Sequence, residues 1–367
     1  MTNAVNIAQG GSNNVTFRNK IINGAMVIDQ RYAGTATANT INAYTLDRWY
    51  ALQTTTGKII VQQNAGSVTP PTGYTYYLGV TSQSAYTVGA GDVYAIFQRI
   101  EGYNIADLAW GTASAATVTF SFWVRSSLTG TFSGTLQNNA QTRAYPFTYT
   151  ISSANTWEQK SVTITGETSG AWLTSNGSGL QVGFSLGAGS TYSGTANAWN
   201  NGNIWAATGA VSVVGTNGAT FYITGVQLEA GTTASPFEYR QFGQELALCQ
   251  RYFEKTFSLT TAPAHNTGEF ITWPNAGSLG CGGNTYITIQ FNERKRATSA
   301  TLRLYDPGAS HTNSENWWRY WGGCGSGTAV GPNSGIALSA TETFISGSLS
   351  ASTGAGNSFN WTAESEL

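Results

Sequence analysis

Charged residues are scarce in this sequence. They make up 10% of its 367 residues and leave a net charge of −1, whereas about a quarter of the residues of an ordinary soluble domain are charged. The basic residues are scattered except for Arg294–Lys295–Arg296, a run that we expect at a solvated turn or strand edge. Nucleic-acid binding needs a clustered basic stripe, so nucleic acid is not predicted as a partner.

Cysteine and histidine are also rare. There are three cysteines (Cys249, Cys281 and Cys324) and two histidines (His265 and His311), with no CxxC pair. This number and spacing exclude a zinc site of the Cys/His finger type and favour buried, reduced thiols. A P-loop, a Rossmann fingerprint and an EF-hand loop are absent, so no cofactor is predicted. A structural calcium held by backbone carbonyls and one aspartate stays open, but the sequence assigns it no position.

Long apolar runs are missing as well. No stretch could span a membrane as a helix, and the first residues, MTNAVNIAQGG, lack the basic start and apolar run of a signal peptide. We therefore expect no membrane insertion. What the chain has in abundance is glycine, with 44 residues, and aromatic residues, at 13%. Together with Ser, Thr and Asn, they are typical of short strands joined by tight turns.

Short strands recur along the first 230 residues. Alternation is clearest in TVTFSFWVR, where Val118, Phe120, Phe122 and Val124 share one face. About a dozen strands without an intervening helix predict packed antiparallel sheets, most simply a jelly roll. The predicted strands after the first fifty residues are KIIVQQ (58–63), YTYYLGVTS (74–82), VYAIFQRIEG (93–102), TVTFSFWVRSS (117–127), TFSGTLQN (131–138), YPFTYTIS (145–152), WEQKSVTITG (157–166), LQVGFSLG (180–187), AVSVVGT (210–216) and FYITGVQLEAG (221–231).

Two earlier segments are also predicted as strands. AMVIDQR (25–31) follows the turn signal Asn23–Gly24. YTLDRWY (44–50) would place Leu46, Arg48 and Tyr50 on one face of a strand.

The segment Phe221–Phe257 divides the chain. Ser235–Pro236 stops a strand, and 241–250 is a run of good helix formers. The predicted fold is therefore all-β: an antiparallel jelly-roll sandwich, a short helix and a second, smaller C-terminal β-sandwich. The predicted units are an N-terminal segment (1–24), a jelly roll (25–240), a helical linker (241–255) and a terminal domain (256–367).

Two places have the residue types that bind sugars. The loop 187–209 is dense in Gly and Asn but contains Tyr192, Trp199 and Trp205, and long loops in compact domains are often functional. Either these aromatic rings stack on a ligand, or they fold back over the edge of the sandwich. In NWWRYW of the terminal domain, Trp317, Arg319 and Trp321 share the face that we expect to be exposed, with Trp318 and Tyr320 in the core.

Catalysis is not predicted. Glycoside hydrolysis needs two carboxyl groups about 5–10 Å apart, but the acidic residues are sparse. Those in distinctive motifs are better explained as ion-pair or turn-fixing groups: Asp47, Glu101, Glu229 and Glu238. His265 and His311 lie in predicted loops away from any GxSxG elbow.

Several motifs resemble a family of phage virion proteins, chiefly tail-fibre and receptor-binding subunits. They occur in the family's order over the first 255 residues: NKIINGAMVIDQR (19–31), YTLDRW (44–49), QRIEG (98–102), SFWVRSS (121–127), FYITGVQLEAG (221–231), SPFEYR (235–240) and CQRYFEK (249–255). The resemblance implies a jelly roll similar to carbohydrate-binding modules, an N-terminal virion-attachment segment and a homotrimer. Residues 256–367 match the family only in placement.

These observations together predict a virion protein, a tail-fibre subunit that adheres to host surface glycan and is assembled in the host cytoplasm. Its expected partners are two further copies of the chain, other tail or baseplate proteins bound through the N-terminus, and the polysaccharide. A purely structural decoration or connector protein is the first alternative. A tail-associated polysaccharide depolymerase is the second.

Overall fold

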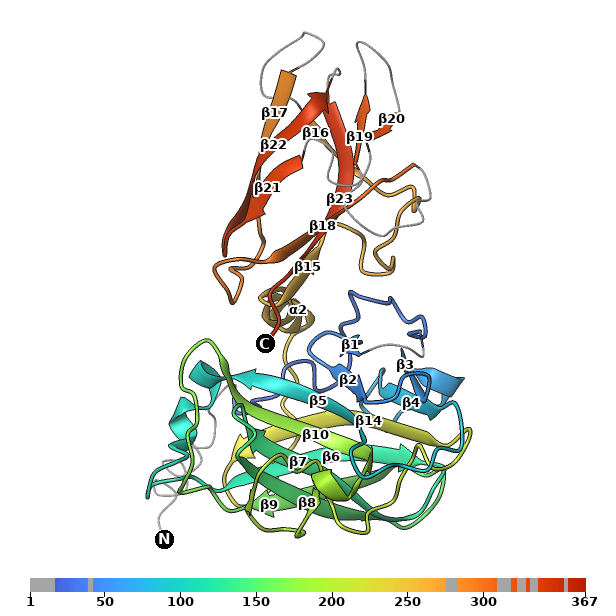
Figure 1. Cartoon of the computed structure of the whole chain (residues 1–367), viewed down its shortest axis with the longest axis vertical. Helices are drawn as coiled ribbons and strands as arrows, with labels where there is room; N and C mark the ends of the chain where they lie inside the picture. Colours follow the sequence, from blue (N-terminus) through green and yellow to red (C-terminus); the bar gives the residue numbers. More distant parts are fainter. Residues whose placement is uncertain are drawn as a thin grey trace, which may run out of the picture.

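The chain forms two β-rich lobes joined at a short helix (Figure 1). The computed structural model describes residues 17–38, 42–274, 283–308, 318–321, 328–330, 336–352 and 356–367. The first lobe ends with strand β14 (Thr220–Ala230), the helix α2 is Phe242–Gln250, and the second lobe starts with β15 (Phe253–Lys255). None of the described helices is long and apolar enough to cross a membrane.

The first lobe is a sandwich of two antiparallel sheets. One has seven strands, in the order β1 (Ala43–Tyr44), β2 (Tyr50–Gln53), β5 (Val93–Glu101), β10 (Ser178–Ala188), β7 (Gly130–Asn138), β8 (Arg143–Ile151) and β12 (Asn200–Asn201). The other has five, in the order β3 (Ile59–Gln63), β4 (Leu78–Ser82), β14, β6 (Val118–Ser126) and β9 (Glu158–Ile164). Strands distant in sequence are neighbours in both sheets, which confirms the predicted jelly-roll sandwich.

Shorter elements complete the first lobe. A small parallel pair is formed by β11 (Ser193–Gly194) and β13 (Ala206–Ala207). Single turns of 3₁₀ helix are η1 (Ala65–Ser67), η2 (Gly102–Asn104), η3 (Ala106–Leu108) and η4 (Ser190–Tyr192).

Alternating apolar residues build the core between the two sheets. On β6, Phe120 and Phe122 are at most 1% exposed, and the intervening Trp123 is only partly buried, which confirms the predicted alternation. The Phe120 ring lies 5.3 Å from that of Phe147 and 5.5 Å from that of Phe184, on two strands of the facing sheet. Such aromatic contacts add to the area buried between the sheets.

The segment predicted as a strand over 44–50 is a turn. β1 ends at Tyr44 and β2 starts at Tyr50, and Arg48 has a φ of 72°, in the left-handed region that strand residues other than glycine do not adopt. The turn buries both Leu46 and Trp49. Leu46 and Trp49 would point to opposite faces of a strand, whereas the turn buries both.

Two further predicted strands are absent from the described part of the chain. In 25–31 the backbone N–H groups bond to side chains instead of to a strand: Ile28 N–H donates to Asn23 Oδ1 (3.0 Å), and Gln30 N–H donates to Asp47 Oδ2 (2.7 Å). In 210–216 the N–H groups of Val213 and Val214 both donate to Leu186 O (2.8 and 3.1 Å). In each case another polar group takes the place of a ladder partner.

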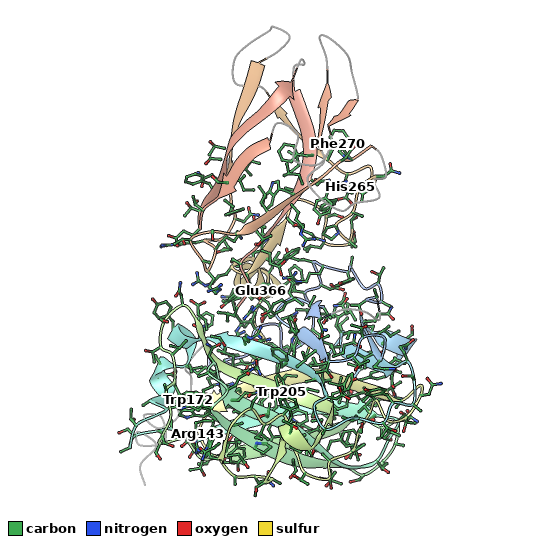
Figure 2. All side chains as sticks on the ribbon, in the orientation of Figure 1. Arg143, Trp172, Trp205, His265, Phe270 and Glu366 are labelled. Carbon is green, nitrogen blue, oxygen red and sulfur yellow. The ribbon has the colours of Figure 1, made fainter. Side chains whose placement is uncertain are left out.

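Figure 2 shows the side chains of both lobes, with Glu366 where the two lobes meet. The second lobe has a six-stranded sheet and a three-stranded sheet. Its strands are β15, β16 (Ile271–Pro274), β17 (Gly283–Gln290), β18 (Thr301–Tyr305), β19 (Trp318–Trp321), β20 (Thr328–Val330), β21 (Ile336–Ala340), β22 (Phe344–Ser352) and β23 (Gly356–Glu364).

Strand β23 organises the second lobe, because β15, β16, β18 and β19 all pair with it. The three-stranded sheet, in the order β17-β22-β21, packs against this sheet through Ile289, Phe291 and Ile345. Leu304 and Trp361 complete a small apolar core. The expected second, smaller sandwich is therefore present.

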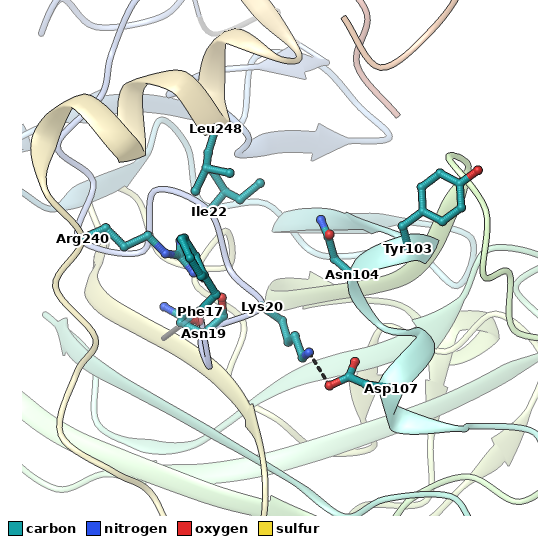
Figure 3. A pocket seen from close by; sticks show the side chains of 9 residues that line it. All are labelled: Phe17, Asn19, Lys20, Ile22, Tyr103, Asn104, Asp107, Arg240 and Leu248. Carbon is teal, nitrogen blue, oxygen red and sulfur yellow. Dashed lines mark hydrogen bonds and ion pairs between the residues drawn. The ribbon is translucent and has the colours of Figure 1, made fainter. Parts of the chain in front are cut away.

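The described part of the N-terminal segment packs on the first lobe (Figure 3). The Glu238 carboxylate accepts hydrogen bonds from the backbone N–H groups of Phe17 (2.5 Å) and Asn19 (2.8 Å). Lys20 Nζ pairs with Asp107 Oδ2 at 2.6 Å. A side chain on Gly24 would place its Cβ 2.2 Å from Val226 O, so this close approach requires glycine.

Lys295 and Arg296 attach the base of the second lobe to the helix and to the first lobe. Lys295 is fully buried, pairs with Glu254 and donates to Gln250 O at 2.5 Å. The neighbouring Arg296 donates to the backbone oxygens of Ser365 and Asn176 (2.8 and 3.1 Å). The expectation that the basic run 294–296 lies at a solvated turn is therefore wrong for these two residues. Through Arg296, this run connects the second lobe to the first.

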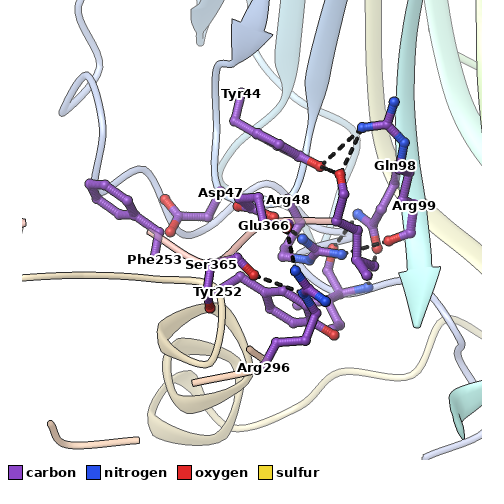
Figure 4. A network of polar contacts seen from close by, with 12 residues as sticks. Tyr44, Asp47, Arg48, Gln98, Arg99, Tyr252, Phe253, Arg296, Ser365 and Glu366 are labelled. Carbon is purple, nitrogen blue, oxygen red and sulfur yellow. Dashed lines mark hydrogen bonds and ion pairs between the residues drawn. The ribbon is translucent and has the colours of Figure 1, made fainter. Parts of the chain in front are cut away.

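The last residues of the chain lie against the first lobe (Figure 4). The Glu366 carboxylate pairs with Arg48 and with Arg31, the latter at 2.9 Å. Leu367 O accepts hydrogen bonds from Tyr44 Oη (2.9 Å) and Arg99 Nη1 (2.8 Å). These contacts join residues more than 250 positions apart in the sequence.

A substitution of Lys295 tests the buried pair. Lys295→Met leaves the Glu254 carboxylate buried without its cation, so we expect the free energy of unfolding to fall by about 3–5 kcal/mol. The neighbouring exposed substitution Arg294→Ala removes a surface pair with Glu342, and we expect a change of at most about 1 kcal/mol. Urea unfolding of both variants measures the difference. Equal effects would contradict the structural role of Lys295.

The buried carboxyl group of Asp47 makes stability depend on pH. Burial raises its pKa to about 7, although the Arg31 guanidinium and the bonds from Gln30 act in the opposite direction. The folded state therefore holds one more proton than the unfolded state between the usual pKa of 3.8 and about 7. This contribution to stability is present in acid and is lost as the pH rises through about 7.

We expect the free energy of unfolding to decrease by about 1–2 kcal/mol from about pH 5.5 to about pH 7.5 through this group alone. Asp47→Asn removes the titration, so its decrease over the same range should be smaller by that amount. Asp107→Asn, at an exposed carboxylate, is the control and should keep the wild-type slope. Chemical unfolding at both pH values gives the comparison, and parallel slopes for Asp47→Asn and wild type would refute it.

Candidate functional site at a tryptophan cluster

The loop 187–209 folds over the outer face of the seven-stranded sheet. Ser133 Oγ accepts the backbone N–H of Ala207 (2.8 Å), and Thr135 Oγ1 donates to Ile204 O (2.7 Å). Trp205 is 4% exposed, with its ring 5.2 Å from that of Phe97. Trp205 therefore folds back over the sandwich, which is the second of the two alternatives given for this loop.

The three candidate residues of the loop are not brought together. Tyr192 packs, partly buried, on the same apolar cluster as Trp205. Trp199 lies in a different group of rings, with Trp110, Trp172 and Tyr145. This second group has two partly exposed tryptophan rings close to polar side chains, and it is the candidate site.

Three tryptophans of this group meet edge to face. The ring centroids are 4.8 Å apart for Trp110–Trp172, 5.5 Å for Trp110–Trp199 and 5.8 Å for Trp172–Trp199. Trp110 is buried, whereas Trp172 and Trp199 are partly exposed. Each indole N–H donates to a backbone carbonyl, of Ala116, Ser169 and Thr165 respectively, at 2.8 to 3.1 Å. The rings are thus fixed in position with part of their apolar surface open to solvent.

Planar polar groups lie beside these rings. Arg143, the first residue of β8, donates to Glu167 Oε2 from Nη2 (2.6 Å) and Nε (3.0 Å), and to the Asn201 side chain from Nη1. Glu167 is 3% exposed and also accepts from Ser169. A guanidinium has five N–H donors, so the three used here leave two for another acceptor.

Two glycines bring the arginine and the tryptophan together. A Cβ on Gly170 would lie 2.7 Å from Arg143 Cγ, and one on Gly111 would lie 3.1 Å from Trp172 Cδ1 and 2.7 Å from Gly170 O. Both glycines have φ near +80°, which favours glycine. The arrangement presents an apolar aromatic surface beside an arginine, an amide and a carboxylate. Such a surface is suited to a ligand with both C–H faces and hydroxyl groups.

The second-lobe candidates are placed only in part. Trp317 lies outside the described residues. Arg319 and Trp321 belong to β19, where they pair in register with Ser358 and Gly356 of β23. They lie in the other lobe from Trp199, so the two groups of candidates do not form one site.

Sequence reasoning missed Trp172, Trp110 and Arg143. Of these three residues, Trp172 could have been found from the sequence, because it is a single tryptophan in the Gly- and Ser-rich connection between two predicted strands. Arg143 carried none, because its neighbours Glu167 and Asn201 are 24 and 58 residues away in the sequence.

The acidic residues singled out as ion-pair or turn-fixing groups have those roles. Glu101 binds Arg251 (2.7 Å) and the Tyr252 hydroxyl (2.8 Å). Glu229 accepts from the backbone and hydroxyl of Ser235 (2.8 and 2.6 Å). Within the described residues, no group of three or more His, Cys, Asp or Glu side chains is arranged to hold a metal ion.

The remaining rare residues are described in part. Cys249 is a free, buried thiol whose pKa is raised by burial. His265 Nδ1 accepts the backbone N–H of Asp306 at 2.9 Å. Cys281, Cys324 and His311 lie outside the described residues.

Comparisons with known proteins give the following results. No protein-family model matches the sequence, and no curated protein matches it. The enzymatically active domain of Bacteriophage CBA120 tailspike protein 4 is 12% identical with a TM-score of 0.32, over 59% of this chain and 22% of that chain. The chain therefore spans less than a quarter of that tailspike domain.

Two other solved structures are covered almost entirely. A putative sugar binding protein from Bacteroides thetaiotaomicron is 12% identical with a TM-score of 0.34, over 58% of this chain and 100% of that chain. TmCBM61, solved in complex with β-1,4-galactotriose, is 9% identical with a TM-score of 0.29, over 58% of this chain and 99% of that chain. At these TM-scores the fold assignment rests on the strand pairing of the chain itself, and function rests on its side chains.

Proposed function

We propose that this protein binds carbohydrate and that Trp172, Trp199, Arg143 and Asn201 form the contact surface. The observation that carries the proposal is the pair of partly exposed indole rings fixed beside a guanidinium with two unused donors. A sugar ring offers C–H groups to an aromatic face and hydroxyl oxygens to N–H donors. A surface binds such a ligand when the C–H groups are buried against aromatic rings and each desolvated hydroxyl keeps a hydrogen-bond partner.

We also propose that the protein is a component of a phage virion. The motifs between residues 19 and 255 that resemble phage tail-fibre subunits support a virion protein, attached through its N-terminal segment and assembled as a homotrimer. Adhesion by three copies would suit a weak site, because the second and third contacts become intramolecular. No catalytic step is part of this function, since Asp47, Glu101, Glu229 and Glu238 are all engaged in internal bonds.

Glycan binding by the full chain tests the proposal. On an array of host-surface glycans we expect wild type to bind a subset, and Trp172→Ala to weaken that binding by about tenfold, the loss expected for one aromatic contact. Trp157→Ala is the matched control, because Trp157 is also a partly buried tryptophan whose indole N–H donates to a backbone carbonyl, that of Thr69. Its glycan affinity should equal that of wild type.

Circular dichroism and thermal unfolding establish that both variants are folded. Undiminished binding by folded Trp172→Ala would remove this site from the proposal. Absence of binding by wild type, together with association only with other virion proteins, would favour the connector function. Release of reducing sugar from a bound glycan would show that the protein is a depolymerase.

A further inference from the structure

A cleft of about 290 Å³ separates the two lobes beside the helix. Its walls come from both lobes, and its main lining residues are Tyr32, Tyr44, Phe253, Thr301, Arg303 and Tyr305. A volume near the lower end of the range for ligand sites suits one or two sugar-sized rings.

One face of the second-lobe sheet forms a wall of this cleft. Side chains two apart on a strand share a face, so Thr301, Arg303 and Tyr305 of β18 lie together. On the neighbouring β23, Glu364 is opposite Thr301 in register, and Phe253 of β15 is opposite Glu364. The wall therefore runs from an aromatic ring, past a carboxylate, to a row of hydroxyl and guanidinium groups.

Contacts within the protein hold the aromatic residues of the cleft in place. The Tyr44 hydroxyl donates to Leu367 O (2.9 Å). The Tyr305 ring packs edge to face on Phe257 at 5.3 Å, and the Arg31 guanidinium lies 4.0 Å from the centroid of Phe253. These contacts fix the rings before any ligand arrives, which lowers the cost of binding.

This cleft differs from the hollow around Phe17 in how its arginine and lysine side chains are paired. Arg31 is matched by Glu364 (3.1 Å) and Glu366 (2.9 Å). The exposed Arg303 guanidinium, by contrast, has no ion pair or hydrogen bond among the described residues. Because the carboxylate in the wall, Glu364, is paired with Arg31, the Arg303 guanidinium is available to an external anion.

The hollow around Phe17 shows the opposite arrangement (Figure 3). Of the two cations in its lining, Lys20 is paired with Asp107 at 2.6 Å. Arg240 donates to Ile21 O at 3.0 Å and lies 3.4 Å from Glu245. Its cations are therefore occupied within the protein.

We propose that the cleft between the lobes binds an acidic saccharide, with Arg303 pairing with the carboxylate of the sugar. Tyr32 provides a partly exposed aromatic ring and a phenol hydroxyl, Tyr305 lies largely buried in the wall, and Thr301 provides an exposed hydroxyl. The inference rests on the proposed carbohydrate binding but uses a second site, distinct from the Trp172 site in the first lobe. Because the walls belong to both lobes, the ligand would also bridge the joint.

Binding of uronic-acid oligosaccharides measures this directly. The probes are glucuronate and galacturonate disaccharides and their neutral glucose and galactose counterparts, titrated calorimetrically into the full chain. We expect wild type to prefer at least one acidic probe over its neutral counterpart by about tenfold or more, the size of one charge-assisted contact. The preference should weaken with salt, because the partly exposed Arg303 is screened.

The variants separate this site from the first. Arg303→Ala should abolish the preference for the acidic probe, and Arg303→Lys should keep part of it, since lysine retains the charge but not the fork of donors. Arg294→Ala, at an arginine of the same lobe whose side chain is 68% exposed, is the matched control and should bind as wild type does. Trp172→Ala should also keep the preference.

An undiminished preference in folded Arg303→Ala would overturn the inference. So would a preference that is lost in Trp172→Ala but kept in Arg303→Ala. Binding of neutral glycans through Trp172 with no acidic preference in wild type would overturn the inference while leaving the proposed function intact. Failure of wild type to bind any glycan would overturn both.

Discussion

Charges buried between two β-sandwiches must meet partners, because an unpaired buried ion costs several kcal/mol. This requirement governs how the lobes of this protein are joined. Arg48 with Glu366 and Arg251 with Glu101 each bury at least one side chain almost completely where the lobes meet. Within the second lobe, Lys295 is buried with Glu254 and also bonds to the end of the helix at Gln250 O. Apolar surfaces can slide past one another, but these pairs have fixed geometry. They set one arrangement of the lobes.

Both candidate sites also need side chains that are held in fixed positions, but different contacts hold them. At the tryptophan cluster the constraint is local: indole N–H groups bonded to carbonyls and glycines that allow close approach. At the cleft the constraint is global: Tyr44 and Arg303 line it from different lobes, and the lobes are joined where Glu366 pairs with Arg31 and Arg48. The first site belongs to one sandwich, whereas the second exists only in the joined chain.

The sequence predicted the fold better than it predicted the sites. Strand alternation in β6 and the helix α2 are local patterns, and the structure confirms them. The strand predicted over 44–50 was wrong because the alternation placed Leu46 and Trp49 on opposite faces, whereas a turn buries both. The role of Lys295 was missed because a lysine is expected in water unless a carboxylate reaches it, and Glu254 reaches it from 41 residues away. For the same reason Trp205 looked available as a ligand contact, although Phe97 covers it.

Composition, periodicity and the hinge motif by themselves determined that the chain is all-β, that a helix divides it, and that its charged motif residues serve as structural groups. These are properties of short segments, set by strand period, turn residues and helix propensity. Only the tertiary structure decided which aromatic rings stay open and which cation lacks a partner. Exposure and pairing depend on residues that are brought together from distant parts of the chain, such as Arg143 with Glu167 and Arg31 with Glu366. No local sequence pattern encodes these long-range contacts.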